Sequence, residues 1–122
     1  MLNNRNEIIS YHSLLKKILN LAEEKKAKKP IVLDIRGISS FSDYFVICHG
    51  DSEPQVKAIA DNIRKKTPNK PRYIEGYEKQ NWILIDYFDI VVHIFKSDFR
   101  EYYAIEKLWG DAPILNIPNE KT

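Results

Sequence analysis

The sequence predicts an α/β (α+β) fold in which helices pack on a mixed sheet of about five strands. Short apolar runs indicate strands, segments with an apolar residue every three or four positions indicate helices, and the two kinds are interleaved along the chain. The expected order of elements is α-β-β-α-β-β-β-α. With 122 residues, 43% of them hydrophobic and 30% charged, the chain has the size and balance of one globular domain.

The N-terminal part is expected to form one helix and two strands. Apolar side chains recur at helical spacing over residues 8–28, and the Lys-rich end of this segment, followed by Pro30, is expected to end the helix. Residues 31–35 form a short apolar run, and a second run lies within residues 43–50. Both are expected to be strands.

The second helix has an N-terminal signature. Ser52, followed three residues later by Gln55, forms a capping box that satisfies free backbone N–H groups at a helix start. This pattern predicts a helix over residues 53–66, which the sequence TPNKP then ends. Residues 72–76 are expected to form a third strand.

The last helix is expected to begin at Asp98, with Glu101 three residues later, and to run to about Trp109. Its apolar residues share one face and are interpreted mainly as core: Phe99, Tyr102, Ile105 and Trp109. The whole pattern predicts one domain over residues 1–113. Residues 114–122 contain little pattern and are expected to form an extended or mobile tail.

The fourth and fifth strands are expected to form a hairpin within NWILIDYFDIVVHIF, residues 81–95. With Tyr87 and Phe88 as a two-residue turn, Asp86 would face Asp89. Successive side chains of a strand point to opposite faces. One face would then be aliphatic and belong to the core: Ile83, Ile85, Ile90, Val92 and Ile94. The other face would be mixed: Trp82, Leu84, Asp86, Asp89, Val91 and His93.

The mixed face, together with Tyr87 at the turn, is our candidate for a protein-binding surface, because large aromatic side chains are enriched at the centre of such surfaces. The alternative is that another helix covers this face as well, with Trp82 in the core and His93 hydrogen-bonded inside. The turn raises a second question, because tight hairpin turns favour a positive φ at the position of Phe88. Either the loop is longer than two residues or Phe88 is strained.

The net charge of +2 hides an asymmetry along the chain. Residues 1–72 carry 14 Lys and Arg against 8 Asp and Glu, and residues 73–122 carry 5 against 9. The basic residues include a cluster at Lys65, Lys66 and Lys70. This cluster is either a solvated helix end, where cations favour the helix dipole, or a contact for the phosphates of RNA. The acidic part, which contains the hairpin, suggests a basic partner.

Few residues suggest catalysis or metal binding. One cysteine, Cys48, excludes an internal disulfide and a cysteine-based zinc site, and a reducing compartment, the cytoplasm, is expected. Adjacent residues of a strand point to opposite faces, so Cys48 and His49 cannot form a nucleophile–base pair by themselves. The turn Gly50-Asp51-Ser52 before a helix is similar to the start of a nucleotidyltransferase domain, but Asp86 and Asp89 do not form the Asp-x-Asp pair that would bind catalytic metals. No enzyme activity, metal, cofactor or membrane contact is expected.

Three motifs together resemble the ribosomal silencing factor family, also called the RsfS or Iojap family. They are SDYFVI at residues 42–47, W-x-L-x-D-Y-x-D-x-V-V-H-x-F at 82–95 and R-E-Y-Y-x-I-E-x-L-W-G-D-A-P at 100–113. The likeness spans residues 8–113. The chain departs from the family pattern at Phe88, where many relatives have Gly.

The resemblance implies a nucleotidyltransferase-like fold without that activity. It also implies a cytoplasmic protein that binds the large ribosomal subunit through ribosomal protein L-fourteen, blocks association with the small subunit and lowers translation when nutrients are short. Trp82, Leu84, Asp86, Tyr87, Asp89, Val91 and His93 would contact the ribosomal protein, with a minor contact of Lys65, Lys66 and Lys70 to ribosomal RNA. Family members are often homodimers when free, and organelle relatives assist subunit assembly, which is the alternative role.

Overall fold

A computed structural model describes residues 2–115 of the chain, and side chains from residue 13 onward. A six-stranded sheet has the strand order β3-β4-β5-β2-β1-β6. All neighbouring strands are antiparallel except β2 and β5, which are parallel. The strands are β1 (Lys28–Asp34), β2 (Tyr44–Gly50), β3 (Tyr73–Glu75), β4 (Trp82–Asp86), β5 (Ile90–Lys96) and β6 (Ile114–Leu115). The predicted mixed α+β fold is confirmed, with one strand more than expected.

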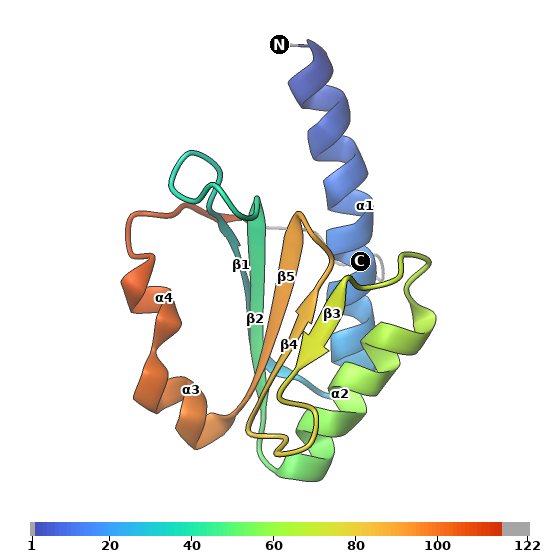
Figure 1. Cartoon of the computed structure of the whole chain (residues 1–122), viewed down its shortest axis with the longest axis vertical. Coiled ribbons are helices and arrows are strands. Elements are labelled where there is room, and N and C mark those ends of the chain that lie inside the picture. Colours follow the sequence, from blue (N-terminus) through green and yellow to red (C-terminus); the bar gives the residue numbers. More distant parts are fainter. Residues whose placement is uncertain (1, 116–122) are drawn as a thin grey trace.

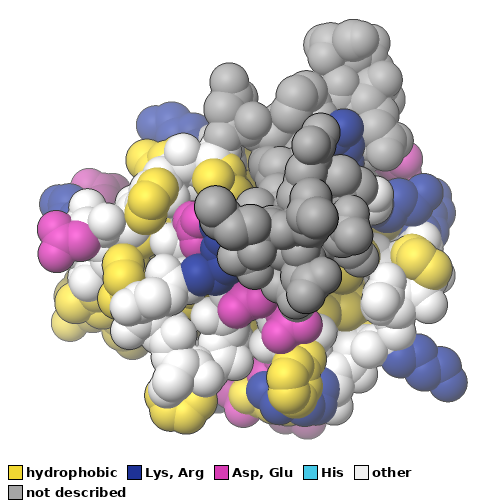
Figure 2. All heavy atoms as spheres, turned by 90° about the horizontal axis from the view of Figure 1, so that it is seen from above, with side chains coloured by type: hydrophobic (Ala, Val, Ile, Leu, Met, Phe, Trp, Pro, Cys, Tyr) yellow, Lys and Arg dark blue, Asp and Glu magenta, His cyan; other side chains and the backbone are white. Residues whose placement is uncertain are grey.

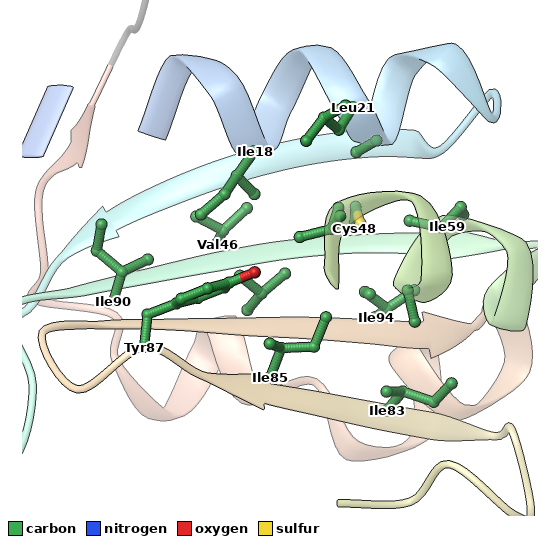
Figure 3. Packing of buried hydrophobic residues seen from close by; sticks show 14 of the residues in the cluster. Ile18, Leu21, Val46, Cys48, Ile59, Ile83, Ile85, Tyr87, Ile90 and Ile94 are labelled. Carbon is green, nitrogen blue, oxygen red and sulfur yellow. The ribbon is translucent and has the colours of Figure 1, made fainter. Parts of the chain in front are cut away.

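Helices lie on both faces of the sheet. One face is covered by α1 (Leu2–Glu24) and α2 (Glu53–Lys66), and α3 (Ser97–Tyr103) and α4 (Ile105–Leu108) lie on the other (Figure 1). The larger core fills the space between the sheet and the first two helices. Figure 3 shows it, with Ile18 and Leu21 of α1 and Ile59 of α2 packed with Val46, Cys48 and the isoleucines of β4 and β5.

The start of α2 confirms the predicted cap. The Ser52 side chain accepts a hydrogen bond from the Gln55 backbone N–H at 3.2 Å, and the helix runs from Glu53 to Lys66 as expected. The Gln55 side chain does not bond back to Ser52. It accepts from the Asp51 N–H at 2.7 Å and donates to the carbonyls of Lys25 and Lys26, which ties the helix start to the end of α1.

The end of α1 was predicted wrongly. The helix ends at Glu24, and Pro30 lies inside β1 instead of terminating the helix. Lys26 has φ +62°, and the N–H groups of Lys26 and Ala27 donate to the carbonyls of Glu23 and Ala22. This is a Schellman turn, which closes a helix through a left-handed residue that is usually Gly. Because this position holds Lys and not Gly, the sequence contained no signal of the turn.

The last helix is also divided. Ala104 has φ +44° and separates α3 from α4, and the backbone of Lys96 occupies the N-cap position, so the predicted capping role of Asp98 and Glu101 is wrong. The break turns Tyr102 out to 81% exposure, whereas Ile105 stays buried in a second core with Phe95. Residues 114–115 of the predicted tail pair with β1, and residues 116–122 lie outside the described residues.

Candidate partner-binding face of the β4–β5 hairpin

The hairpin has the two predicted faces but a different register. Asp86 pairs with Val91, Leu84 with His93 and Trp82 with Phe95, so the register differs by two residues from the prediction. A shift by two keeps every side chain on its face, because the side-chain period of a strand is two. The aliphatic face is confirmed as core: Ile83, Ile85, Ile90, Val92 and Ile94 all pack in the cluster under α1 and α2.

The hairpin tip is longer than a two-residue turn. The Tyr87 N–H donates to the Ile90 carbonyl at 2.8 Å, and the Asp89 N–H donates to the Tyr87 carbonyl at 3.1 Å. Phe88, at the centre of this γ-turn, has φ +80° and is 58% exposed. Both explanations offered for Phe88 therefore hold, since the loop is longer and the residue takes a conformation that is rare for a bulky side chain.

Tyr87 does not lie on the mixed face, which corrects its predicted place. Its side chain enters the core on the α1–α2 side (Figure 3), where its hydroxyl lies 2.7 Å from Thr67 Oγ1. Burial raises the pKa of the Tyr87 phenol. Strand alternation explains this position, because Tyr87 follows Ile83 and Ile85 in steps of two and therefore points to the same aliphatic face.

Asp86 is buried and forms an internal ion pair, which corrects the expectation that it faces Asp89. It is 3% exposed, its Oδ2 accepts from Arg72 Nη2 at 2.8 Å, and its Oδ1 accepts from the Phe88 N–H at 2.7 Å. The hydrogen bond to Asp86 raises the pKa of Arg72. The Arg72 guanidinium also lies 4.7 Å from the centre of the Phe88 ring. Asp86 therefore holds the hairpin tip, and its counter-charge comes from within the chain.

Trp82 and His93 form a hydrogen-bonded pair on the mixed face. Trp82 Nε1 donates to His93 Nδ1 at 3.1 Å. His93 is 5% exposed, and burial lowers its pKa to about 4. Because the indole can only donate, the neutral imidazole carries its proton on Nε2, which has no hydrogen-bond partner among the described residues. His93 is thus buried and bonded inside, as the alternative interpretation of this face predicted.

The other helices cover only part of the mixed face. Phe99 of α3, Ile105 of α4 and Trp109 pack over β1, β2 and β5. Trp82 is half-buried, with its ring 4.7 Å from Phe95 and 5.2 Å from Tyr103. Towards the sheet edge, no helix of the described chain covers the mixed face, so part of this face stays open. The sequence predicted only some of the residues of this open part. We call Tyr73, Glu75, Trp82 and Leu84 the open strip, in which Tyr73 is 45% exposed and Leu84 is half-buried beside Glu75.

Two exposed aromatic residues extend the apolar surface at the hairpin tip. Phe41 is 86% exposed in the loop between β1 and β2. This loop is tied to the tip, because Ser42 Oγ donates to the Phe88 carbonyl at 3.2 Å and the Asp43 N–H donates to the Asp89 carbonyl at 2.8 Å. Figure 2 views this end of the molecule and shows hydrophobic side chains at the surface beside charged ones. Sequence reasoning missed Phe41, although an aromatic residue in a Ser-rich loop was a signal.

The basic cluster lies on the side of the sheet away from the open strip. Lys65 and Lys66 are exposed in the last turn of α2, and Lys70 is exposed in the loop that follows. Lys66 lies 3.5 Å from a carboxylate oxygen of Glu24. Helix α2 packs on the aliphatic face of the sheet, opposite the open strip. A partner bound to the open strip would therefore not cover these lysines, and a second partner could contact them.

Cys48 and His49 point to opposite faces, as predicted. Cys48 is buried in the larger core, and burial raises the pKa of its thiol to about 12. Among the described residues, no group of three or more His, Cys, Asp or Glu side chains is arranged to hold a metal ion. No helix within residues 2–115 has the length and apolar character needed to span a membrane.

Comparisons with known proteins identify the family and the fold of the chain. The family described as "Ribosomal silencing factor during starvation" (RsfS) matches residues 9–122. A ribosomal silencing factor RsfS from Halalkalibacterium halodurans is 45% identical over 112 residues, which cover 89% of this chain and 96% of that protein. The mouse protein named "Mitochondrial assembly of ribosomal large subunit protein 1" is 29% identical over 98 residues, 75% of this chain and 43% of its own length. A crystal structure of a Chromobacterium violaceum protein has a TM-score of 0.77 at 35% identity, covering 80% of this chain and 84% of that one.

Proposed function

The chain belongs to the ribosomal silencing factor (RsfS/Iojap) family, and we propose that it lowers translation by binding the large ribosomal subunit through ribosomal protein L-fourteen. Bound there, it would keep the small subunit away by steric occlusion when nutrients are short. We place this activity in the cytoplasm and propose that the free protein is a homodimer.

The open strip is the observation that carries this proposal. It places Tyr73 of β3 beside Trp82 and Leu84 of β4 on one face at the sheet edge, with Tyr73 exposed and the other two partly exposed. Exposed apolar groups of this kind mark binding surfaces for other proteins. Glu75 beside Leu84 gives the strip an acidic edge that suits a basic ribosomal protein.

Trp82 is suited to be the anchor of the contact. Its indole is fixed by the hydrogen bond to His93 and by the rings of Phe95 and Tyr103. A side chain already held in one conformation loses little conformational entropy on binding, so more of its contact energy appears as affinity. Asp86, Val91 and His93, which are buried, would support the surface from below.

We also propose that the chain does not catalyse nucleotidyl transfer. Catalysis would need two metal-binding carboxylates beside the Gly50-Asp51-Ser52 turn. Because β2 and β5 are parallel and Tyr44 pairs with Ile90, Asp86 and Asp89 lie at the opposite end of the sheet from Ser52. Seven strand residues separate the two ends, a distance of about 20 Å. The Asp86 carboxylate is also bonded to Arg72.

Assistance in assembling the large subunit is a second candidate function. The similarity to the mouse protein named for that process favours it. Both functions use a contact with the large subunit, and they differ in when the contact forms. Deleting the gene would separate them, since an assembly factor leaves precursor particles when it is absent, whereas a silencing factor leaves mature subunits that associate too readily during starvation.

The substitution Trp82→Ala tests the anchor. We expect it to weaken binding to purified large subunits by ~2 kcal/mol or more, about thirty-fold in affinity, because large aromatic anchors contribute most of the energy of such contacts. Binding is measured by co-sedimentation at several subunit concentrations. The same variant should no longer prevent subunit association in a sucrose gradient.

The matched control is Trp109→Ala, which removes the other tryptophan. Trp109 packs against Phe45 in the second core, at 5.4 Å between ring centres, and lies outside the open strip. This control should lose stability and retain affinity at temperatures where it is folded. The proposal fails if Trp82→Ala binds as the unmodified chain does, or if both variants lose affinity in proportion to their loss of stability.

A further inference from the structure

We propose that a cleft at the carboxyl ends of β2 and β5 binds a small molecule that carries a diphosphate group. The cleft has a volume of about 490 Å³, which is within the range of small-molecule sites. Apart from Ala104, its lining residues carry polar or charged side chains, among them Lys29, His49, Ser97, Arg100, Glu106 and Lys107. None of them belongs to the open strip.

The topology places this cleft where open α/β sheets bind ligands. The parallel strands β2 and β5 end side by side, with Gly50 paired to Lys96. The chain then continues into α2 on one face of the sheet and into α3 on the other, as Figure 1 shows. A crevice forms outside the carboxyl ends of two parallel strands when their connections leave to opposite sides, and this is the usual ligand position in such folds.

A buried arginine organises the cleft. Arg100 is 8% exposed, and its Nη1 donates to the Lys29 carbonyl at 2.8 Å and lies 3.0 Å from His49 Nδ1. Its Nε and Nη2 face the two carboxylate oxygens of Glu106, each at 3.3 Å. One side chain thus fixes the start of β1, the end of β2 and α4 around the same space.

The contact with Arg100 also determines the state of His49. A guanidinium has no acceptor, so His49 Nδ1 must accept the hydrogen bond, and the neutral ring carries its proton on Nε2. Burial and the positive charge of Arg100 lower the pKa of His49, which keeps the ring neutral. His49 and Ser97 both line the cleft, so the lining includes a neutral N–H donor and a hydroxyl.

The charges of the lining favour an anion. Lys29, Arg100 and Lys107 face Glu101 and Glu106, and Glu106 already pairs with Arg100. Within the described residues, Lys29 and Lys107 form no ion pair within 4.0 Å. Two ammonium groups in one lining with a neutral N–H donor and a hydroxyl match a group that has several anionic oxygens, and a diphosphate is such a group.

The test is isothermal titration calorimetry of the full chain with pyrophosphate, ADP and adenosine in separate experiments at low ionic strength. The variant Lys29→Gln/Lys107→Gln removes both unpaired ammonium groups and leaves the Lys29 carbonyl in place for Arg100. The charge-matched control is Lys17→Gln/Lys25→Gln, which changes two exposed lysines, one in α1 and one directly after it. Thermal unfolding of each variant checks that it is folded.

We expect pyrophosphate or ADP to bind with a stoichiometry of one, adenosine not to bind, and the Lys29→Gln/Lys107→Gln variant to bind at least about ten-fold more weakly. The control should bind as the unmodified chain does. The proposal is overturned if neither pyrophosphate nor ADP binds, if adenosine binds as well as ADP, or if both double variants lose affinity equally, which would indicate a non-specific effect of net charge.

Discussion

Individual polar residues of the hairpin form their contacts within the fold, and they affect a partner only indirectly. Asp86 and His93 are almost fully buried, with hydrogen bonds to Arg72 and to Trp82. A buried carboxylate or imidazole is costly unless it is paired, and both pairs come from within the chain. These residues set the position of Trp82 and of the tip, and they affect recognition through that position.

The buried imidazole predicts a loss of stability in weak acid. The pKa of His93 is about 4 in the folded chain, against 6.5 for an exposed histidine. The unfolded chain therefore binds a proton as the pH falls below 6.5, while the folded chain stays neutral until about pH 4, so stability is lost across this window. Between pH 7 and pH 5 the free energy of unfolding should fall by about 2 kcal/mol because of this residue.

Urea unfolding at the two pH values measures this loss. The control is His93→Asn, whose side-chain oxygen can still accept from Trp82 Nε1 and which does not titrate. The difference between pH 7 and pH 5 should shrink by the same amount in this variant. If the free energy of unfolding falls equally between pH 7 and pH 5 in both chains, another titrating group is responsible.

At the scale of elements, left-handed residues decide where helices and strands end. Lys26 ends α1, Ala104 separates α3 from α4, and Phe88 turns the hairpin. None of the three is Gly, so the usual sequence marker of such a turn is absent. Gly37 and Gly76 are the two glycines with positive φ. Replacing each by Ala separates the destabilisation caused by backbone strain from the destabilisation caused by crowding of the new Cβ.

Gly76→Ala should be much more destabilising than Gly37→Ala. Both glycines have φ near +80°, at +79° and +83°. A Cβ at Gly76 would lie 1.9 Å from the Trp82 carbonyl oxygen, whereas at Gly37 it would meet nothing within 4 Å. Gly37→Ala should cost only the left-handed strain, about 1–2 kcal/mol.

Gly76→Ala should exceed that cost by at least about 1 kcal/mol, because β3 must move away from β4. Thermal or urea unfolding of both variants supplies the comparison. Equal losses of stability in the two variants would mean that the loop before Trp82 moves away from the added methyl group without a cost in free energy.

At the scale of the whole molecule, the end of α2 and the open strip lie on opposite faces of the sheet. Residues 1–72 hold the excess of Lys and Arg, and residues 73–122, which include the hairpin and the helices after it, hold the excess of Asp and Glu. A contact with a ribosomal protein on the open strip and a contact with RNA phosphates at Lys65, Lys66 and Lys70 can therefore form together. RNA contacts of this kind release counterions and make affinity depend on salt.

Replacing Lys65, Lys66 and Lys70 together by Gln should flatten the salt dependence of binding to the large subunit. If all three contact phosphates, the slope of log affinity against log salt should decrease by about 2–3. The control replaces Lys79, Lys96 and Lys121, which lie in the acidic part of the chain. Equal slopes for the two triple variants would show that the α2 lysines are only a solvated helix end.

The sequence by itself determined the class of fold and the inward face of the hairpin. Periodicity is a local property of the chain, so the strand alternation that places Ile83, Ile85 and Ile90 in the core is visible before folding, as is the cap at Ser52. The three motifs also determined the family. The short strand at residues 114–115 had no such local signal, because only its pairing with β1 makes it a strand.

Tertiary structure alone decided which polar residues of the mixed face remain available. Arg72 and Asp86 are 14 positions apart in the chain, and their ion pair exists because β3 lies beside β4. The break at Ala104 likewise determines how far α3 and α4 cover the sheet, and hence how much of Trp82 stays at the surface. The cleft around Arg100 joins segments up to 72 positions apart. Such contacts depend on distances across the folded chain, which no pattern of neighbouring residues encodes.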